Sequence, residues 1–172
     1  MYIRHTHPED IDRLLEIYQE ARTFMVQQGN PTQWTHGYPS KDLLMQDIHH
    51  ANSYVCIEKD RIVGTFAFII GEDPTYQVIE NGAWHAAIEY GTIHRAASDG
   101  TTKGLTTYIF DYCTAKKEYV RIDTHQNNLP MQNAVKRYGF QPCGIIHVAD
   151  GSPRVAFDYI KNNLNLIKKI VI

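Results

Sequence analysis

The chain has 172 residues, of which 43% are hydrophobic and 21% charged, and its formal net charge at pH 7 is −2. This length suits one domain with a real core, and the composition is that of an ordinary globular protein. The weak negative charge argues against a nucleic-acid partner, because duplex binding requires a clustered basic face. No segment resembles a signal peptide and no apolar run approaches membrane-spanning length, so we expect a soluble, cytoplasmic protein without a membrane partner. The three cysteines, Cys56, Cys113 and Cys143, are widely spaced and suggest neither a disulfide framework nor a metal site.

The first fifty residues predict a strand followed by two helices. Residues 1–4 read as a short strand, and Thr6-His-Pro-Glu9 is typical of a capping box at a helix start. That helix ends at the stop signal Gly29-Asn30-Pro31. Residues 32–39 form a loop rich in aromatic residues, and Ser40 caps a second, shorter helix. The apolar residues at helical spacing are Ile11, Leu14, Leu15, Tyr18, Ala21 and Met25 in the first helix and Leu43, Leu44 and Ile48 in the second.

The middle of the chain has the two-residue period of β-structure. Residues 54–58 and 62–70 predict a β-hairpin across a turn at residues 59–61. Residues 76–79 and 90–97 predict further strand material.

The second half alternates between helices and strands. A helix follows Gly104, residues 120–124 predict a strand, and a further helix ends at Gly139 as its C-cap. Residues 143–148 and 154–159 predict two strands around a hairpin turn. The apolar residues at helical spacing are Leu105, Tyr108, Ile109, Tyr112 and Cys113 in the first helix and Met131, Ala134, Val135 and Tyr138 in the second.

The element order β-α-α-β-β-β-α-β-α-β-β predicts one domain over residues 1–172. Strand-to-helix crossovers occur only in the second half, which indicates a mixed α/β fold with a sheet that is mainly antiparallel in its first half. Helices are expected on both faces of that sheet. The amphiphilic tail, residues 161–172, could dock on the body of the protein or on a second subunit, so a homodimer is possible.

The loop before the central helix, residues 98–104, contains only small or polar residues apart from Lys103. A helix N-terminus leaves N–H groups unpaired and carries a partial positive charge, and glycine permits a ligand to approach closely. The segment is therefore suited to a phosphorylated ligand. A Walker loop would place its lysine after the final glycine, whereas Lys103 precedes Gly104, and the dinucleotide fingerprint G-x-G-x-x-G is absent. Nucleoside triphosphates and dinucleotides are thus disfavoured.

Several motifs resemble the GNAT superfamily of acyl-CoA N-acyltransferases. Residues 101–106, T-T-K-G-L-T, resemble its pyrophosphate pattern Q/R-x-x-G-x-G/A, with Gly104 the one match among the three defined positions. Residues 128–140 resemble its N-x-x-A-x-x-x-Y-x-x-x-G-F stretch, with Val135 at the tyrosine position. The segments G-N-x-x-Q-W, Y-G-T-I-H-R, D-T-H and G-F-Q-P-C-G-I-I resemble one bacterial branch, so the resemblance covers nearly the whole chain. It implies a GNAT-like α+β fold whose mostly antiparallel mixed sheet has splayed middle strands.

The resemblance also implies acetyl-CoA as the cofactor. The strand before the loop would pair with the pantetheine arm through Ala96, Ala97 and Ser98. Asn128 corresponds to the family asparagine near the pantetheine. An alternative is that Gly104 only begins a helix and Asn128 only caps one. The backbone expected to receive the pyrophosphate belongs to Thr102, Lys103, Gly104, Leu105 and Thr106.

The implied activity is transfer of an acetyl group from acetyl-CoA directly to a primary amine of a small molecule or peptide. The attacking amine must be neutral. For an amine with a pKa of about 10, neutrality at pH 7 costs about 4 kcal/mol, so we expect a general base. The sequence leaves open polyamines, amino acids, aminoglycosides and protein N-termini as acceptors.

Three residues are candidates for the base. His94 lies on the central strand with the parity of Ala96, and an imidazole, with its ordinary pKa near 6.5, suits the task. It could instead be a histidine hydrogen-bonded inside the sheet. Glu89 lies near the place where relatives carry a base glutamate, or is an exposed carboxylate. His125 could act with Asp123, or the two could simply bond to each other.

The acid step and the acceptor pocket are less defined. Val135 stands where many relatives carry an acid tyrosine, and the place of Tyr138 in an apolar stripe favours a core role. We expect Trp34, Tyr38 and Trp84 either to form walls of the acceptor pocket or to cover the core. Because of Val135 and the degenerate loop, the alternative function is a non-catalytic acyl-CoA-binding or regulatory module on the same fold.

Overall fold

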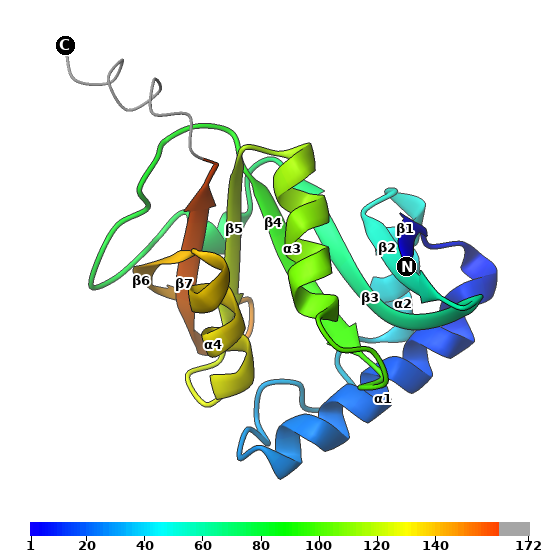
Figure 1. Cartoon of the computed structure of the whole chain (residues 1–172). Helices are drawn as coiled ribbons and strands as arrows, with labels where there is room; N and C mark the ends of the chain where they lie inside the picture. Colours follow the sequence, from blue (N-terminus) through cyan, green and yellow to red (C-terminus); the bar gives the residue numbers. More distant parts are fainter. Residues whose placement is uncertain (162–172) are drawn as a thin grey trace.

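The computed structural model describes residues 1–161, which form one sheet with helices on both of its faces (Figure 1). The observed order of strands and helices is the one predicted from the sequence. The strands are β1 (Tyr2–His5), β2 (Ser53–Glu58), β3 (Arg61–Ile70), β4 (Gly91–Ser98), β5 (Tyr119–Thr124), β6 (Gln141–His147) and β7 (Pro153–Ile160). The helices are α1 (Ile11–Gln27), α2 (Lys41–His49), α3 (Leu105–Lys116) and α4 (Leu129–Tyr138), with 3₁₀ turns at η1 (Pro8–Asp10) and η2 (Pro74–Tyr76).

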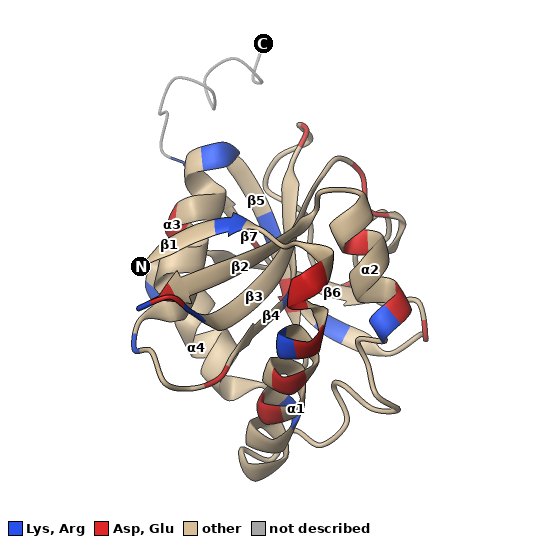
Figure 2. Ribbon diagram, turned by 90° about the vertical axis from the view of Figure 1, so that its right-hand side faces the viewer, with Lys and Arg blue, Asp and Glu red and all other residues tan. Residues whose placement is uncertain are grey.

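The sheet has the strand order β1-β2-β3-β4-β5-β7-β6 and is mixed, as predicted. Adjacent strands run antiparallel to each other, except that β4 and β5 are parallel. Side chains of β2 alternate between the two faces, so that Cys56 packs with α3 while Val55 packs with α1 and α2. In Figure 2, Lys and Arg are scattered among Asp and Glu on this side of the molecule, including the outward face of α1.

Local signals explain where the helices begin and end. Ser40 caps α2, because its Oγ accepts a hydrogen bond of 3.2 Å from the Leu43 N–H. Asn128 caps α4 in the same way, with its Oδ1 accepting from the Met131 N–H at 3.2 Å. Gly139 closes α4 with φ of 115°, a conformation that glycine adopts without a Cβ clash. The caps predicted at Ser40 and Gly139 are confirmed, and Asn128 has the capping role that was the alternative to a cofactor contact.

The two middle strands separate part-way along their length. β4 and β5 are paired only at Gly91–Val120, Thr92–Arg121 and Ile93–Ile122. Beyond that point β4 continues to Ser98 and β5 to Thr124 without pairing to each other. The predicted splay is confirmed.

A β-bulge in β4 overturns the predicted parity of His94 and Ala96. Thr65 pairs with Ala97 and Ala67 with His94, so two residues of β4 oppose Phe66. One of them, Arg95, has φ of 54°, in the left-handed region that residues other than glycine rarely adopt. The extra residue shifts the alternation, so Ala96 packs toward α3 whereas the ring of His94 lies near Tyr76, on the opposite face.

The capping box predicted at Thr6 and Glu9 was wrong by one residue. The carboxylate of Asp10 accepts a 2.8 Å hydrogen bond from the His7 N–H, so His7 takes the cap position of η1. The hydroxyl of Thr6 is instead bonded to Ser53 Oγ at 2.7 Å, which ties the end of β1 to β2.

The strand predicted at residues 76–79 was also wrong. Pro74 fits the first turn of η2, and the Asp73 side chain accepts a 2.9 Å hydrogen bond from the Thr75 N–H, which favours a helical turn there. Tyr76 is fully buried and its hydroxyl donates to Asp123. The nearest β-pairing is an isolated bridge between Glu80 and Ile145.

The tail from residue 162 onward lies outside the described residues, so its docking and the homodimer stay predictions. In residues 1–161, none of the helices is both long and apolar enough to cross a membrane.

Candidate functional site

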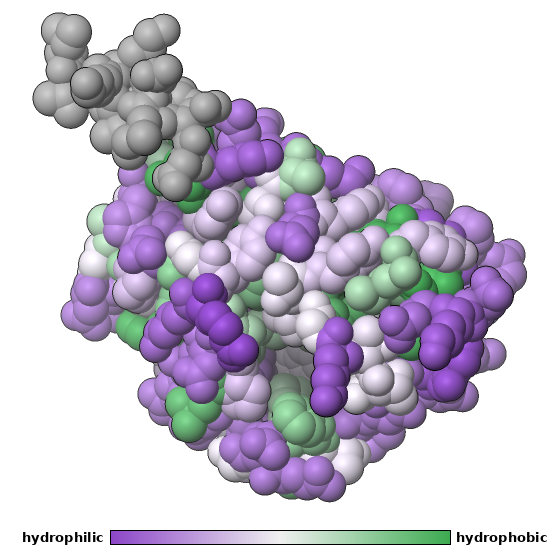
Figure 3. Space-filling model, in the orientation of Figure 1, coloured by the Kyte–Doolittle hydropathy of each residue, from purple (hydrophilic) through white to green (hydrophobic). Residues whose placement is uncertain are grey.

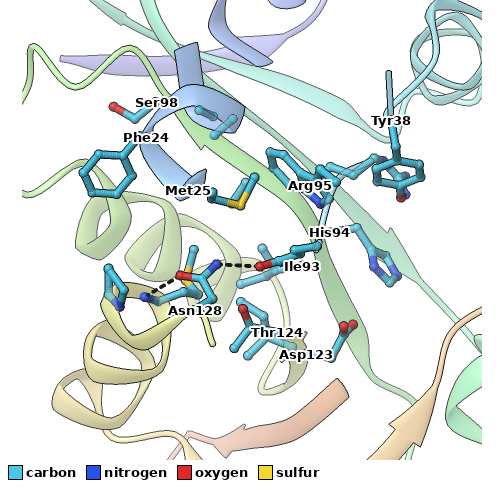
Figure 4. A pocket seen from close by; sticks show the side chains of 18 of the residues that line it. Phe24, Met25, Tyr38, Ile93, His94, Arg95, Ser98, Asp123, Thr124 and Asn128 are labelled. Carbon is cyan, nitrogen blue, oxygen red and sulfur yellow. Dashed lines mark hydrogen bonds between the residues drawn. The ribbon is translucent and has the colours of Figure 1, made fainter. Parts of the chain in front are cut away.

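A cavity of about 900 Å³ lies where β4 and β5 separate. Its walls come from the C-terminal half of α1, the α1–α2 loop, and the first turns of α3 and α4. Figure 3 shows a hollow on the face that carries α3 and α4. In Figure 4, Ile93, His94 and Arg95 of β4 lie across this cavity from Asp123, Thr124 and Asn128.

The residues predicted to hold the cofactor fall into two groups. Those lining the cavity are Ala96, Ala97, Ser98, Leu105, Thr106 and Asn128. Thr102, Lys103 and Gly104 are not part of the lining. The Thr102 hydroxyl donates to Glu58 at 2.7 Å, so it is already engaged.

The N-terminus of α3 is open to an anionic group. Gly104 takes the cap position with φ of 77° and provides no capping side chain, and a Cβ built on it would meet nothing within 4 Å. Within residues 1–161, the N–H groups of Gly104, Leu105 and Thr106 have no acceptor. The preceding loop is held by Asp99, which accepts from the Thr101 N–H at 3.0 Å and from Arg13 at 2.8 Å. A pyrophosphate fits such a preorganised helix start.

Asn128 connects two distant parts of the cavity wall. Besides capping α4, it donates from Nδ2 to Gln33 Oε1 at 2.8 Å. Gln33 also accepts from Asn30 at 2.6 Å, which fixes the α1–α2 loop beside α4. Sequence reasoning missed Gln33, because no local pattern marks a contact across 95 positions.

His94 is oriented by a carboxylate that the sequence did not suggest. Its Nε2–H donates to Asp73 Oδ2 at 2.9 Å, and the two side chains are 17% and 19% exposed. Because a carboxylate only accepts, Nδ1 of neutral His94 carries the lone pair. That nitrogen has no partner in the described part of the chain, and His94 lines the cavity.

A second polar pair lies beside the first. Tyr76 donates from its hydroxyl to Asp123 Oδ1 at 2.6 Å, and the Tyr76 ring is 6.0 Å from the His94 ring. Burial and the Asp123 carboxylate raise the pKa of Tyr76 well above its ordinary value, so Tyr76 stays a neutral donor. Thr124, next to Asp123, has a buried hydroxyl without a partner among residues 1–161, and it also lines the cavity.

The Asp73–His94 contact predicts a pH dependence of stability. Burial raises the pKa of Asp73, but hydrogen bonds from His94 and Thr75 outweigh it and lower that pKa from 3.8 to about 2. Because the folded pKa is below the unfolded one, this stabilisation is present above pH ~4 and is lost as the pH falls through ~2. The difference corresponds to about 2 kcal/mol.

We therefore expect Asp73→Asn to remove about 2 kcal/mol of the fall in unfolding free energy between pH 5 and pH 2, measured by urea titration. The control is Asp42→Asn, since Asp42 is exposed and forms no hydrogen bond through its side chain in residues 1–161. Parallel pH curves for wild type and Asp73→Asn would contradict the expectation.

The other two predicted bases lie away from the cavity lining. Glu89 is exposed and pairs with Lys117. His125 accepts at Nδ1 from the Asn127 N–H at 3.1 Å and does not contact Asp123 through a hydrogen bond. Burial and the charge of Arg154 lower the pKa of His125.

Of the predicted aromatic walls, Trp34 and Tyr38 line the cavity and their rings are 6.3 Å apart. Trp84 does not line it. It stacks on Tyr76 at 5.1 Å, and Arg121 lies 4.0 Å above its ring, so Trp84 covers the core.

The positions considered for an acid lie outside the cavity lining as well. Val135 is fully buried in the core between α3, α4 and the sheet. The hydroxyl of Tyr138 bonds to Thr114 and donates to Asp111, each at 2.9 Å, and burial raises the pKa of Tyr138 to about 12. Tyr138 thus has the core role that its apolar stripe favoured.

One cluster apart from the cavity has metal-ligating side chains: His85, Cys143 and Asp158. His85 Nδ1 donates to Asp158 Oδ1 at 2.8 Å, and Asp158 Oδ2 accepts from Tyr119 at 2.8 Å. These bonds satisfy the carboxylate without an ion. Burial raises the pKa of Cys143, which disfavours the thiolate that a metal requires.

Solved structures of other proteins have the same architecture. No family model and no curated protein sequence matches the chain. An acetyltransferase of the GNAT family from Streptococcus agalactiae is 31% identical, with a TM-score of 0.84 over 94% of this chain and 96% of that one. A GNAT-family acetyltransferase from Listeria monocytogenes is 16% identical, with a TM-score of 0.67 over 92% and 94% of the two chains. GphF, a GNAT-like decarboxylase in complex with isobutyryl-CoA, is 15% identical, with a TM-score of 0.64 over 94% and 100%.

Proposed function

Because this chain belongs to the GNAT family of acyltransferases, we propose that it transfers the acetyl group of acetyl-CoA directly to a primary amine of a small molecule or peptide. The observation that carries the proposal is a single cavity with an open helix start at one side and an oriented histidine at the other. A phosphorylated carrier and an amine could thus meet between the separated strands.

The residues that would hold the cofactor lie on β4 and at the starts of α3 and α4. Ala96, Ala97 and Ser98 come after the last pair with β5, so the edge they present to the cavity is unpaired with β5 and suits a pantetheine arm. The N–H groups of Gly104 to Thr106 would receive the pyrophosphate, and Lys103 adds a positive charge nearby. The Thr124 hydroxyl and Asn128 are polar groups beside the same path.

His94 is our proposed general base, assisted by Asp73 as a positioning residue. Nδ1 of His94 would take the proton from the amine, and Asp73 stabilises the imidazolium that results. The lowered pKa of Asp73 keeps this carboxylate charged at neutral pH, where the assistance is required. Asp123 presents a second carboxylate toward the same space and attracts an ammonium group.

No acid residue is assigned. Acetyl-CoA supplies a thioester whose thiol has an ordinary pKa of about 8.5 and leaves near neutral pH with little help. Losing the base should therefore slow the reaction more than the lack of an acid at Val135 does.

The test is release of free thiol from acetyl-CoA across a panel of primary amines, with CoA binding followed in parallel by thermal shift. We expect stabilisation by CoA and acetyl-CoA, and acetyl-CoA-dependent acetylation of at least one amine, verified by mass spectrometry. CoA-induced stabilisation without turnover of any amine would instead favour the non-catalytic acyl-CoA-binding module.

A further inference from the structure

Arg154, at the start of β7, is a buried cation that forms no direct ion pair within residues 1–161. It is 7% exposed and lines the cavity. Its Nη1 donates to Ser152 Oγ at 2.8 Å and to Pro153 O at 3.0 Å, and its Nη2 lies 3.5 Å from Gln33 O. These acceptors are all neutral, and Nε donates to no group in residues 1–161. Asp150, which also lines the cavity, is linked to Arg154 only through Ser152, whose hydroxyl donates to Asp150 Oδ1. The guanidinium thus faces the cavity with spare donors and without a carboxylate in direct contact.

The other arginines buried near this region are compensated. Arg95 donates to both oxygens of Asp47, at 2.9 and 2.8 Å. Arg121 lies between the rings of Trp84 and Tyr90, at 4.0 and 3.8 Å. Arg154 has neither a carboxylate within 4.0 Å nor an aromatic ring beneath it, counting only residues 1–161. Leaving a buried charge unpaired is costly, which points to an anionic ligand group.

Arg154 shares a face of the sheet with the proposed catalytic groups. Asp123 pairs with Ala156, and Arg154 is on the same side of β7 as Ala156 because side chains alternate. His94 lies on this face as well, near Tyr76 and Asp123. Along β7, Arg154 lies two residues, about 7 Å, from Ala156, the residue that pairs with Asp123. Asp123 therefore lies at one end of this face and the Arg154 guanidinium at the other.

Resting on the acetyltransferase function proposed above, we propose that the acceptor is an amino acid whose carboxylate is bound by Arg154. The ammonium pole of such a zwitterion faces Asp123 and His94, and the carboxylate receives paired N–H donors from the guanidinium. Once His94 removes a proton from the ammonium group, the neutral nitrogen attacks the thioester carbonyl. The acyl–sulfur bond breaks as the amide bond forms, and the thiolate leaves with its electron pair. The second proton of the nitrogen passes to that thiolate to give the free thiol, and His94 releases the first proton to solvent.

The experiment compares the twenty amino acids with their carboxamides, which keep the amine and lose the carboxylate. Two readouts are taken: kcat/KM by thiol release, and calorimetric binding to the protein–CoA complex. We expect the preferred amino acid to exceed its carboxamide by about 10- to 100-fold in both. In Arg154→Gln the ratio of amino acid to carboxamide should fall toward one. In Arg154→Lys this ratio should be intermediate, because lysine keeps the positive charge but lacks the planar, two-pronged guanidinium. Arg137→Gln, at an exposed position of α4, is the matched control and should keep the wild-type ratio.

The outcomes separate this inference from the function on which it rests. Turnover of amino acids and carboxamides at equal kcat/KM, with equal binding of both, overturns the role of Arg154 and leaves the acetyltransferase standing. Binding of amino acids that depends on Arg154, without turnover of any amine, supports the carboxylate site and overturns the acetyltransferase. A variant that fails to fold is recognised by its CoA-induced thermal shift, and the carboxamide comparison in the wild-type protein then decides.

Discussion

Replacing His94 by glutamine is expected to lower kcat/KM for the accepted amine by about 10²–10⁴-fold at pH 7, the usual contribution of a general base. Glutamine can still donate to Asp73 from its amide, so the hydrogen bond of 2.9 Å that positions the side chain has a substitute. What glutamine lacks is a basic ring nitrogen that can accept the proton of the amine. The measurement is thiol release under saturating acetyl-CoA.

The pH profile distinguishes a base from a structural residue. The neutral fraction of an amine with a pKa of about 10 rises tenfold per pH unit below that value, so the variant should recover as the pH rises. A residue needed only for packing would give a deficit independent of pH. His49→Gln, on the exposed end of α2, serves as the control. A loss in His125→Gln or Asp123→Asn that exceeds the loss in His94→Gln would move the base to that residue.

The regular elements were predictable because their signals are local. Ser40, Asn128 and Gly139 mark helix ends through contacts within three or four residues of themselves. The strands follow from apolar alternation, and the splay of β4 and β5 follows from the family resemblance. The strand predicted at residues 76–79 was wrong because Asp73 and Pro74 favour a 3₁₀ turn, and that turn includes Tyr76, the first residue of the predicted strand.

The candidate site was only partly predictable, because its decisive contacts join residues far apart in the sequence. The lining residues around the loop, from Ala96 to Thr106, could be placed from the resemblance to a known motif. Asp73 is 21 positions from His94, and its turn signal with Pro74 does not indicate a contact with that histidine. The bulge at Arg95 has no sequence signal either, since a glycine would be the usual mark of a positive φ. The bulged residue pairs with Asp47, which is 48 positions away.

That ion pair gives the second large expectation: Asp47→Ala should lower the free energy of unfolding by about 3–5 kcal/mol. Asp47 is buried and accepts from Arg95 Nε at 2.9 Å and Nη2 at 2.8 Å, and the Arg95 side chain is 9% exposed. Removing the carboxylate leaves a guanidinium desolvated and unpaired in a residue already held at φ of 54°. The bulge then keeps one hydrogen bond from α1, which the Tyr18 hydroxyl donates to Arg95 O at 2.9 Å.

Urea unfolding measures the effect, with Gln46→Ala, an exposed residue of α2, as the control at within about 0.5 kcal/mol of wild type. The double variant Asp47→Leu with Arg95→Met should be more stable than Asp47→Ala, because it buries no unpaired charge. A double variant as unstable as Asp47→Ala would show that the charge pair is not what holds the bulge. The bulge also sets the faces of β4, so that His94 faces the acceptor side while Ala96 faces α3. Weakening it should therefore reduce kcat/KM even under conditions where the Asp47→Ala variant remains folded.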